Sequence, residues 1–125
     1  MTRVFLILVD VQLCERLQGV FQLEGDFAVS GGVRSGVEIV EKAAESIPDL
    51  ILMETEVPPF TAFELADQIK RTMPTVPIFI IAERQTWQVE KEARLHGINA
   101  VFDKEEDFSS LLLNARAECS VGTLK

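Results

Sequence analysis

Asp10, Glu54 and Lys104 are the residues whose types and positions could do chemistry, and each comes directly after or close behind a short apolar segment. If those segments are parallel strands, their carboxyl ends meet at one edge of a sheet, which is where open α/β sheets bind ligands. Two carboxylates and a lysine brought together there could hold a divalent cation or form a salt-bridged cluster. Whether they meet depends on the elements that position them.

The apolar segments have the pattern of strands that are buried on both faces. Residues 4–9, 50–53 and 78–81 are continuously apolar rather than alternating, which is typical of a parallel sheet covered by helices. Shorter segments at 27–29 and 100–102 complete a set of five predicted strands.

A segment with helical period follows each predicted strand. The residues expected on the buried faces of the five helices are, in order, Leu13, Leu17, Val20 and Phe21; Val37, Val40, Ala44 and Ile47; Ala62, Leu65, Ala66, Ile69 and Met73; Val89 and Ala93; and Phe108, Leu111, Leu112, Ala115 and Cys119. Prolines separate several of these elements, and we interpret the Gly31-Gly32 pair as a turn.

Five strand–helix units predict a single α/β domain over residues 3–117. Right-handed crossovers place helices on both faces of a doubly wound parallel sheet, for which we expect the strand order 2-1-3-4-5. The first and third strands are then neighbours, so Asp10 and Glu54 should face one another, with Lys104 arriving from the other side. Residues 118–125 have no helical or strand period and are predicted to form a loose tail.

The composition excludes some classes of function. The chain of 125 residues has 20 acidic against 12 basic side chains, a net charge of −8. A surface of this charge repels phosphate groups, so we expect no direct binding to nucleic acid or to an anionic membrane. Cys14 and Cys119 lack disulfide or metal-site spacing, and no apolar stretch approaches the length of a membrane span. These features predict a soluble cytoplasmic domain.

Three segments resemble landmarks of the receiver domains of bacterial response regulators: VFLILVD at residues 4–10, PDLILME at 48–54 and VFDK at 101–104. VPP at 57–59 is similar to the Met-Pro-Gly loop of that family. The resemblance covers residues 3–117 and implies a flavodoxin-like, CheY-like fold and a role in two-component phosphorelay signalling. It also implies a signalling domain rather than an enzyme, so we assign no catalytic residue.

The resemblance places Glu54 where receivers have the aspartate that accepts a phosphoryl group. Receivers hold Mg²⁺ with paired acids after the first strand, but here Asp10 is followed by Val11. A glutamate carries its carboxylate one methylene further out, and misplacement by about 1 Å can cost on the order of 100-fold in rate. We therefore expect Asp10, Glu54 and Lys104 to form a degenerate site, a pseudo-receiver without efficient phosphorylation. We expect at most weak Mg²⁺ binding at Asp10 and Glu54, and no other cofactor.

Two positions that respond to phosphorylation in receivers are also substituted. The resemblance assigns the hydroxyl residue at the end of the fourth strand to Ile81 and the aromatic switch residue of the fifth strand to Val101. Glu105 follows Lys104 where the family has a proline. Two interpretations of Glu54 stay open: its carboxylate imitates the phosphorylated state by pairing with Lys104, or the site has simply lost its chemistry.

Protein contact is the output that the resemblance implies. In receivers, the face formed by the fourth helix, the fifth strand and the fifth helix contacts partners, and we assign Trp87, Val101 and Lys104 to it. We expect a signalling protein or a second copy of the chain to bind there. The alternatives are a conventional Mg²⁺-dependent phosphoacceptor and a flavodoxin-like binder of a small ligand. The lack of a glycine-rich phosphate loop argues against the second alternative.

Overall fold

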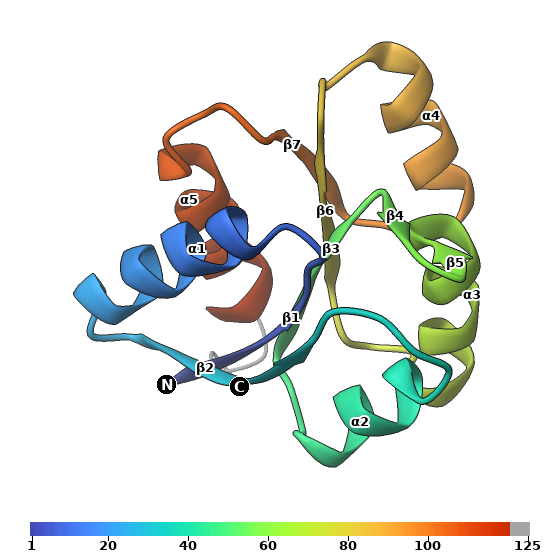
Figure 1. Ribbon diagram of the computed structural model, residues 1–125. Helices are drawn as coiled ribbons and strands as arrows, with labels where there is room; N and C mark the ends of the chain where they lie inside the picture. Colours follow the sequence, from blue (N-terminus) through green and yellow to red (C-terminus); the bar gives the residue numbers. More distant parts are fainter. Residues whose placement is uncertain (121–125) are drawn as a thin grey trace.

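A parallel sheet of five strands forms the middle layer of the structure, a computed structural model in which residues 1–120 are described (Figure 1). The strands of this sheet are β1 (Thr2–Ile7), β2 (Phe27–Val33), β3 (Leu50–Glu54), β6 (Ile78–Ala82) and β7 (Ala100–Asp103). Their order across the sheet is β2-β1-β3-β6-β7, and every neighbouring pair is parallel. The predicted α/β class and five-stranded parallel sheet are confirmed.

A short hairpin was absent from the prediction and changes the strand numbering. Its strands, β4 (Glu56–Val57) and β5 (Phe60–Thr61), pair antiparallel outside the main sheet. The fourth and fifth strands of the sheet are therefore β6 and β7. Two-residue strands leave no periodic signal in a sequence, which is why apolar patterning cannot reveal them.

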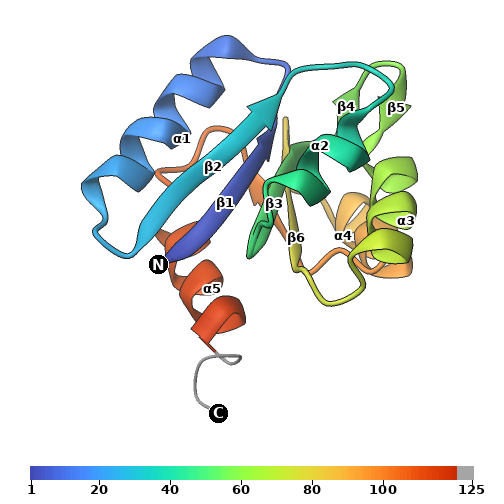
Figure 2. The same ribbon diagram turned by 90° about the horizontal axis from the view of Figure 1, so that it is seen from below.

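Five helices cover the two faces of the sheet. They are α1 (Val11–Leu23), α2 (Ile39–Glu45), α3 (Ala62–Thr72), α4 (Trp87–Leu95) and α5 (Ser109–Ser120). Helices α1 and α5 lie on one face, and α2, α3 and α4 lie on the other (Figures 1 and 2). This is the doubly wound arrangement that right-handed crossovers predict.

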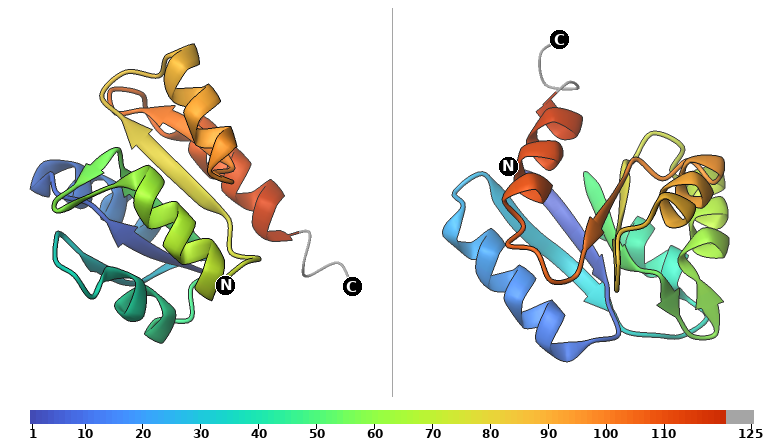
Figure 3. Two further views of the ribbon diagram at one scale, coloured as in Figure 1. Left: turned by 90° about the vertical axis from the view of Figure 1, so that its right-hand side faces the viewer. Right: turned by 90° about the horizontal axis from the view of Figure 1, so that it is seen from above.

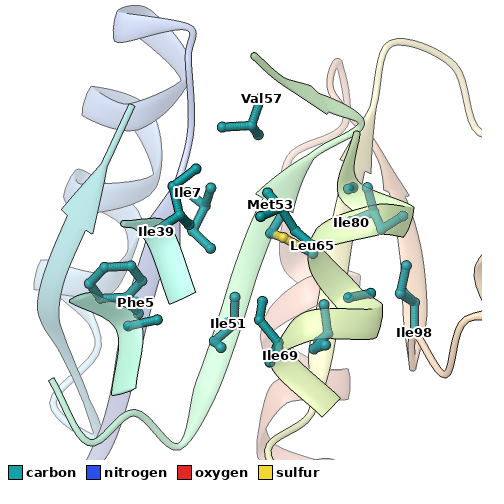
Figure 4. Packing of buried hydrophobic residues seen from close by; sticks show 14 of the residues in the cluster. Phe5, Ile7, Ile39, Ile51, Met53, Val57, Leu65, Ile69, Ile80 and Ile98 are labelled. Atoms are coloured by element: carbon teal, nitrogen blue, oxygen red, sulfur yellow. The ribbon is translucent and has the colours of Figure 1, made fainter. Parts of the chain in front are cut away.

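The core is divided by the sheet into two apolar clusters. Phe5 and Ile7 of β1 pack toward α2 and α3, together with Ile51 of β3, as Figure 4 shows. Val4 and Leu6, which alternate with them, pack toward α1 and α5. Successive residues of the central strands are buried on opposite faces, so these strands are apolar without interruption.

The predicted apolar face of α2 is wrong at both of its ends. Val37 and Ile47 have exposed fractions of 76% and 75%, and the residues that α2 buries are Ile39, Val40 and Ala43. The helix has only seven residues, from Ile39 to Glu45, so Val37 and Ile47 lie in the flanking turns. The predicted faces of α1, α3 and α5 agree with the structure, with Leu13, Leu65 and Leu111 among the buried residues, in that order.

The Gly31-Gly32 pair is not a turn but part of β2, where it pairs with Phe5 and Leu6 of β1. A Cβ atom on Gly32 would lie 2.9 Å from the carbonyl oxygen of Leu6, so the close approach of the two strands requires glycine there. The register between β1 and β2 shifts beside this pair, leaving Ser30 without a partner on β1.

The predicted tail begins too early. Helix α5 continues to Ser120, so residues 118–120 are helical, while 121–125 lie outside the described residues. Within residues 1–120, no helix combines the length and the apolar character that crossing a membrane would require.

Candidate functional site

The carboxyl edge of the sheet brings the three predicted residues into one neighbourhood. Asp10 is the N-cap of α1, Glu54 is the last residue of β3, and Lys104 directly follows β7. Because β1 lies beside β3, the turn after β1 sits over Glu54. Figure 3 (right) views the fold from above this edge.

Both carboxylate oxygens of Asp10 are engaged by the protein itself. Oδ1 accepts hydrogen bonds from the backbone N–H groups of Gln12 and Leu13, at 2.9 and 3.2 Å, and so caps α1. Oδ2 lies 2.6 Å from Nζ of Lys104. The hydrogen bond from Lys104, together with the capped N–H groups, lowers the pKa of Asp10.

Glu54 binds the backbone rather than the lysine. Its Oε1 accepts hydrogen bonds from the N–H groups of Val9 and Asp10, both at 2.7 Å. These groups lie between the end of β1 at Ile7 and the first turn of α1, where neither element supplies an acceptor. The carboxylate of Glu54 therefore fixes the β1–α1 turn. The interpretation in which Glu54 pairs with Lys104 is not supported by the structure.

Lys104 is held by acids from two other segments. Besides Asp10, its Nζ lies 3.0 Å from Oε1 of Glu83. These two carboxylates, Asp10 foremost, raise the pKa of Lys104 above its ordinary value. The acidic residues next to Lys104 in the chain, Asp103 and Glu105 among them, make no ion pair with it.

The loop that carries Lys104 is anchored from α1. The guanidinium of Arg16 donates to the carbonyl oxygens of Lys104 and Glu106, at 3.1 and 3.2 Å, and lies 4.9 Å from the centre of the Phe108 ring. The N–H of Lys104 also donates to the carbonyl of Ala82. These hydrogen bonds and the cation–π contact fix the backbone of the loop from which the Lys104 side chain extends.

Sequence reasoning missed Glu83 and Arg16. Glu83 directly follows Ala82, the last residue of β6, so the rule that selected Asp10 and Glu54 selects it as well once β6 is extended by one residue. Arg16 has no such signal, because its partners are backbone carbonyls and an aromatic ring.

Comparisons with known proteins agree with this fold. The profile of the response regulator receiver domain matches residues 4–116. The chain belongs to this family. This chain is 31% identical over 65 residues to the luminescence regulatory protein LuxO of Vibrio campbellii. It is 33% identical over 58 residues to the response regulator protein VraR of Staphylococcus saprophyticus. These matches span 52% and 46% of this chain but only 14% and 28% of the two relatives.

Solved structures share the fold of this receiver domain at low sequence identity. A LuxR-family two-component response regulator from Aurantimonas superposes with a TM-score of 0.88 at 18% identity, covering 97% of this chain and 86% of that chain. The response regulator domain of CheB from Thermotoga maritima superposes with a TM-score of 0.84 at 21% identity, covering 96% and 97%. Receiver domains of this kind are in general signalling domains rather than enzymes.

The position assigned to the receiver switch at the end of the fourth strand needs a correction. Ile81 is not the last residue of β6, and its side chain is buried against α1 and α5 in the cluster that contains Phe102. The terminal position belongs to Ala82, whose side chain also lacks a hydroxyl. Because successive side chains of a strand point to opposite faces, moving the strand end from Ile81 to Ala82 places the terminal side chain on the other face of the sheet.

The three residues assigned to the partner face have different environments. Trp87 begins α4 and is 67% exposed. Val101 is only 6% exposed, because it packs into the cluster beneath α3 and α4. The prediction that Val101 contributes to the partner face is therefore wrong. Lys104 is engaged by Asp10 and Glu83 at the site.

The residues of the site do not fit the Mg²⁺ ion that conventional receiver domains hold. Mg²⁺ requires about six oxygen ligands in octahedral geometry. Both oxygens of Asp10 are committed, one oxygen of Glu54 is committed, and Val11 offers only methyl groups where a second acid would stand. Across residues 1–120, no three His, Cys, Asp or Glu side chains converge in a way that could bind a metal ion.

An open hollow beside Glu54 is lined mostly by acidic and apolar groups. Its lining residues are Val9, Glu54, Thr55, Glu56, Pro58 and Glu83. Lys104 neutralises Glu83, while Glu54 and Glu56 give the hollow a negative charge that repels an approaching phosphoryl donor. The hollow therefore has a net negative character.

Proposed function

We propose that this receiver domain of a response regulator works through protein contact, without accepting a phosphoryl group at residue 54. The observation that carries the proposal is that the chain's own groups occupy the site. The carboxylate of Glu54 is bound by the β1–α1 turn, and the ammonium of Lys104 is bound by Asp10 and Glu83.

Phosphoryl transfer to Glu54 would require the contacts of Glu54 and Lys104 to break. A nucleophile must reach its target in line, and a metal or ammonium must neutralise the charge that develops on the phosphoryl oxygens. Here Oε1 of Glu54 faces two N–H donors, and Lys104 already neutralises two carboxylates. A conventional Mg²⁺-dependent phosphoacceptor would need both groups free.

The same contacts support one fixed conformation of the carboxyl edge. Asp10 links α1 to the loop after β7, and Glu54 links β3 to the turn after β1. Ala82 and Val101 lack the hydroxyl and aromatic groups through which receivers report phosphorylation. The domain is therefore suited to presenting a constant surface to a partner.

Helix α4 and the edge strand β7 provide the surface that we assign to this partner. Trp87 and Leu95 are 67% and 72% exposed and lie two helical turns apart on α4. Exposed tryptophan is enriched at the energetic centres of protein interfaces. A polar groove beside α4 runs along β7 and includes Glu90, Asn99 and Glu106 among its lining residues.

Glu106 adds a recognition element to this groove. Its Oε1 is shielded from solvent and has no hydrogen-bond partner within the described residues. Burial, together with the charge of Asp103 and Asp107, raises the pKa of Glu106. A partner that donates a hydrogen bond from a basic or amide group would satisfy this oxygen.

Incubation with acetyl phosphate and Mg²⁺ tests the first half of the proposal. We expect the intact mass and the fluorescence of Trp87 to remain unchanged, while a conventional receiver domain in the same buffer gains one phosphoryl group. A mass gain on this chain would establish the phosphoacceptor alternative instead.

Genetic complementation tests the contact surface. In the native organism, a copy of the gene with Trp87→Ala should lose signalling output, whereas Leu23→Ala, which removes an even more exposed apolar side chain from α1, should retain it. Equal output from the two variants would show that the surface around Trp87 is not the site of contact.

A further inference from the structure

The outer edge of β2 is open and uncharged. β2 ends the sheet and pairs only with β1, as Figure 2 shows. Its sequence, FAVSGGV over Phe27–Val33, has neither the charged side chain nor the proline with which proteins usually protect an edge strand. The backbone groups on its outer side are therefore accessible to another strand.

A trough runs along this edge between β2 and α1. Two adjoining hollows of about 350 and 320 Å³ share Gln18 and Val29 in their lining. The first lies over Phe21 and Phe27, and the second reaches the Gly31-Gly32 pair, where no side chain fills the space. An added strand would find both free backbone groups and an apolar floor for its side chains.

Opposite charges flank the two ends of β2. Glu24 and Asp26 precede the strand and share one cation, the guanidinium of Arg116. Arg34 follows the strand, is exposed, and makes no ion pair within residues 1–120. One end of β2 is therefore acidic, and the other is basic.

We propose that β2 pairs with the β2 strand of a second copy of this chain, antiparallel and about a two-fold axis near Ser30. An antiparallel arrangement places Arg34 of each copy beside Asp26 of the other, whereas a parallel one would place like charges together. Val29 of each copy then lies opposite Gly31 of the other and fills the space over the glycine pair. Such a self-complementary edge matches the isologous contact of two-fold dimers.

The dimer joins two sheets into one of ten strands and leaves α4 and β7 free. β2 and β7 are the opposite edges of the sheet, so this contact does not depend on the surface assigned to a signalling partner. The unpaired residue Ser30 increases the local twist of β2 and limits how many backbone hydrogen bonds two copies can form. We therefore expect a reversible dimer whose population rises with protein concentration.

Sedimentation velocity over a concentration series, with two charge-reversal variants, tests the proposal. Arg34→Glu should weaken dimerisation about tenfold, because two symmetry-related ion pairs become repulsive. Arg84→Glu is the matched control, since it changes the net charge equally at an exposed position on the β6–α4 loop and should leave dimerisation unchanged.

Hydrogen exchange locates the contact. Amide exchange in residues 27–33 should slow as the concentration of the wild-type chain rises, and this protection should be lost in Arg34→Glu. A chain that remains monomeric at every concentration, equal weakening by both variants, or protection confined to α4 and α5 would each overturn the proposal.

Discussion

The length of the glutamate side chain is central to the site at the residue scale. With one methylene more than aspartate, Glu54 carries its carboxylate from the end of β3 to the N–H groups of Val9 and Asp10. Glu54 therefore has a structural role in the turn that leads into α1.

Glu54→Gln tests this role, because the amide oxygen can still accept hydrogen bonds but has no negative charge. We expect the free energy of unfolding, measured by urea denaturation, to fall by about 1 kcal/mol. Glu56→Gln is the control, since the side chain of Glu56 is exposed and makes no hydrogen bond within the described residues. Equal stability of the two variants would show that Glu54 does not fix the turn. A partner affinity that is unchanged in Glu54→Gln would also exclude a role as a phosphorylation mimic.

Lys104→Met tests the ion pair with Asp10 through its pH dependence. The folded-state pKa of Asp10 is lowered, so its contribution to stability is present above the unfolded-state pKa and disappears as the pH falls through the folded-state value. The stability difference between wild type and Lys104→Met should therefore be largest near neutral pH and should shrink below about pH 4. Urea denaturation at several pH values measures it. Lys91→Met, on the exposed side of α4, should show no such dependence.

A histidine connects two helices at the scale of elements. His96 is the C-cap of α4, and its Nδ1 lies 2.8 Å from Oδ1 of Asp67 on α3, while its Nε2 lies 3.4 Å from Glu92 on α4. The ring also lies 5.5 Å from that of Phe63 on α3. The hydrogen bond with Asp67, aided by Glu92, raises the pKa of His96 above 6.5.

The packing of α4 on α3 should therefore depend on pH. A raised folded-state pKa gives stability that is fully present below the unfolded-state value of 6.5 and is lost as the pH rises through the folded-state value. The melting temperature of wild type should exceed that of His96→Gln by more at about pH 5.5 than at about pH 8.5. Asp67→Asn should remove most of this difference. A difference that does not change with pH would contradict the expectation.

The close pairing of β1 with β2 predicts opposite effects on stability for alanine substitutions at two glycines. Gly32→Ala forces a Cβ atom against the carbonyl of Leu6 and should destabilise the domain by about 1–3 kcal/mol. Gly19→Ala is the matched control within α1, where no atom lies within 4 Å of the added carbon, and it should stabilise the domain by up to about 1 kcal/mol. Thermal denaturation of both variants measures the difference. Destabilisation by both would mean that the effect at Gly32 is not specific to the strand contact.

The elements that could be predicted are those whose periodicity and end signals agree. Helix α3 shows both, since its apolar residues have helical spacing and Thr61 and Glu64 form a capping box at its start. Helix α2 has neither a side-chain cap nor sufficient length, so its face could not be inferred. The sequence does not distinguish a strand from a turn at the glycine pair in β2, because a tight strand contact and a turn both select glycine.

The site could be predicted in its composition but not in its contacts. The expectation that residues after parallel strands meet at one edge of the sheet places Asp10 near Lys104, as the structure shows. It could not show that Glu54 binds backbone N–H groups, since an acceptor of this kind has no side-chain signature in the sequence. For the same reason, it could not show which of several acids engages Lys104.

At the scale of the whole molecule, the two outer strands of the sheet and its carboxyl edge have different roles. Internal ion pairs and hydrogen bonds close the carboxyl edge, where Asp10, Glu54 and Lys104 lie. β7 and α4 form the surface proposed for a signalling partner, and β2 forms the surface proposed for a second copy. A receiver domain of this kind would assemble proteins in a constant conformation, with its output set by the concentrations of its partners.

Backbone amide NMR tests the closed site most directly. The domain is titrated with Mg²⁺ and beryllofluoride, a phosphoryl analogue, while the signals of Val9, Asp10 and Lys104 are followed. The closed site predicts that these signals do not move, because Glu54 and Lys104 stay bound to their internal partners. Saturable shifts of these three signals, extending to α4, would show that the site opens and binds a phosphoryl group, and would contradict the account.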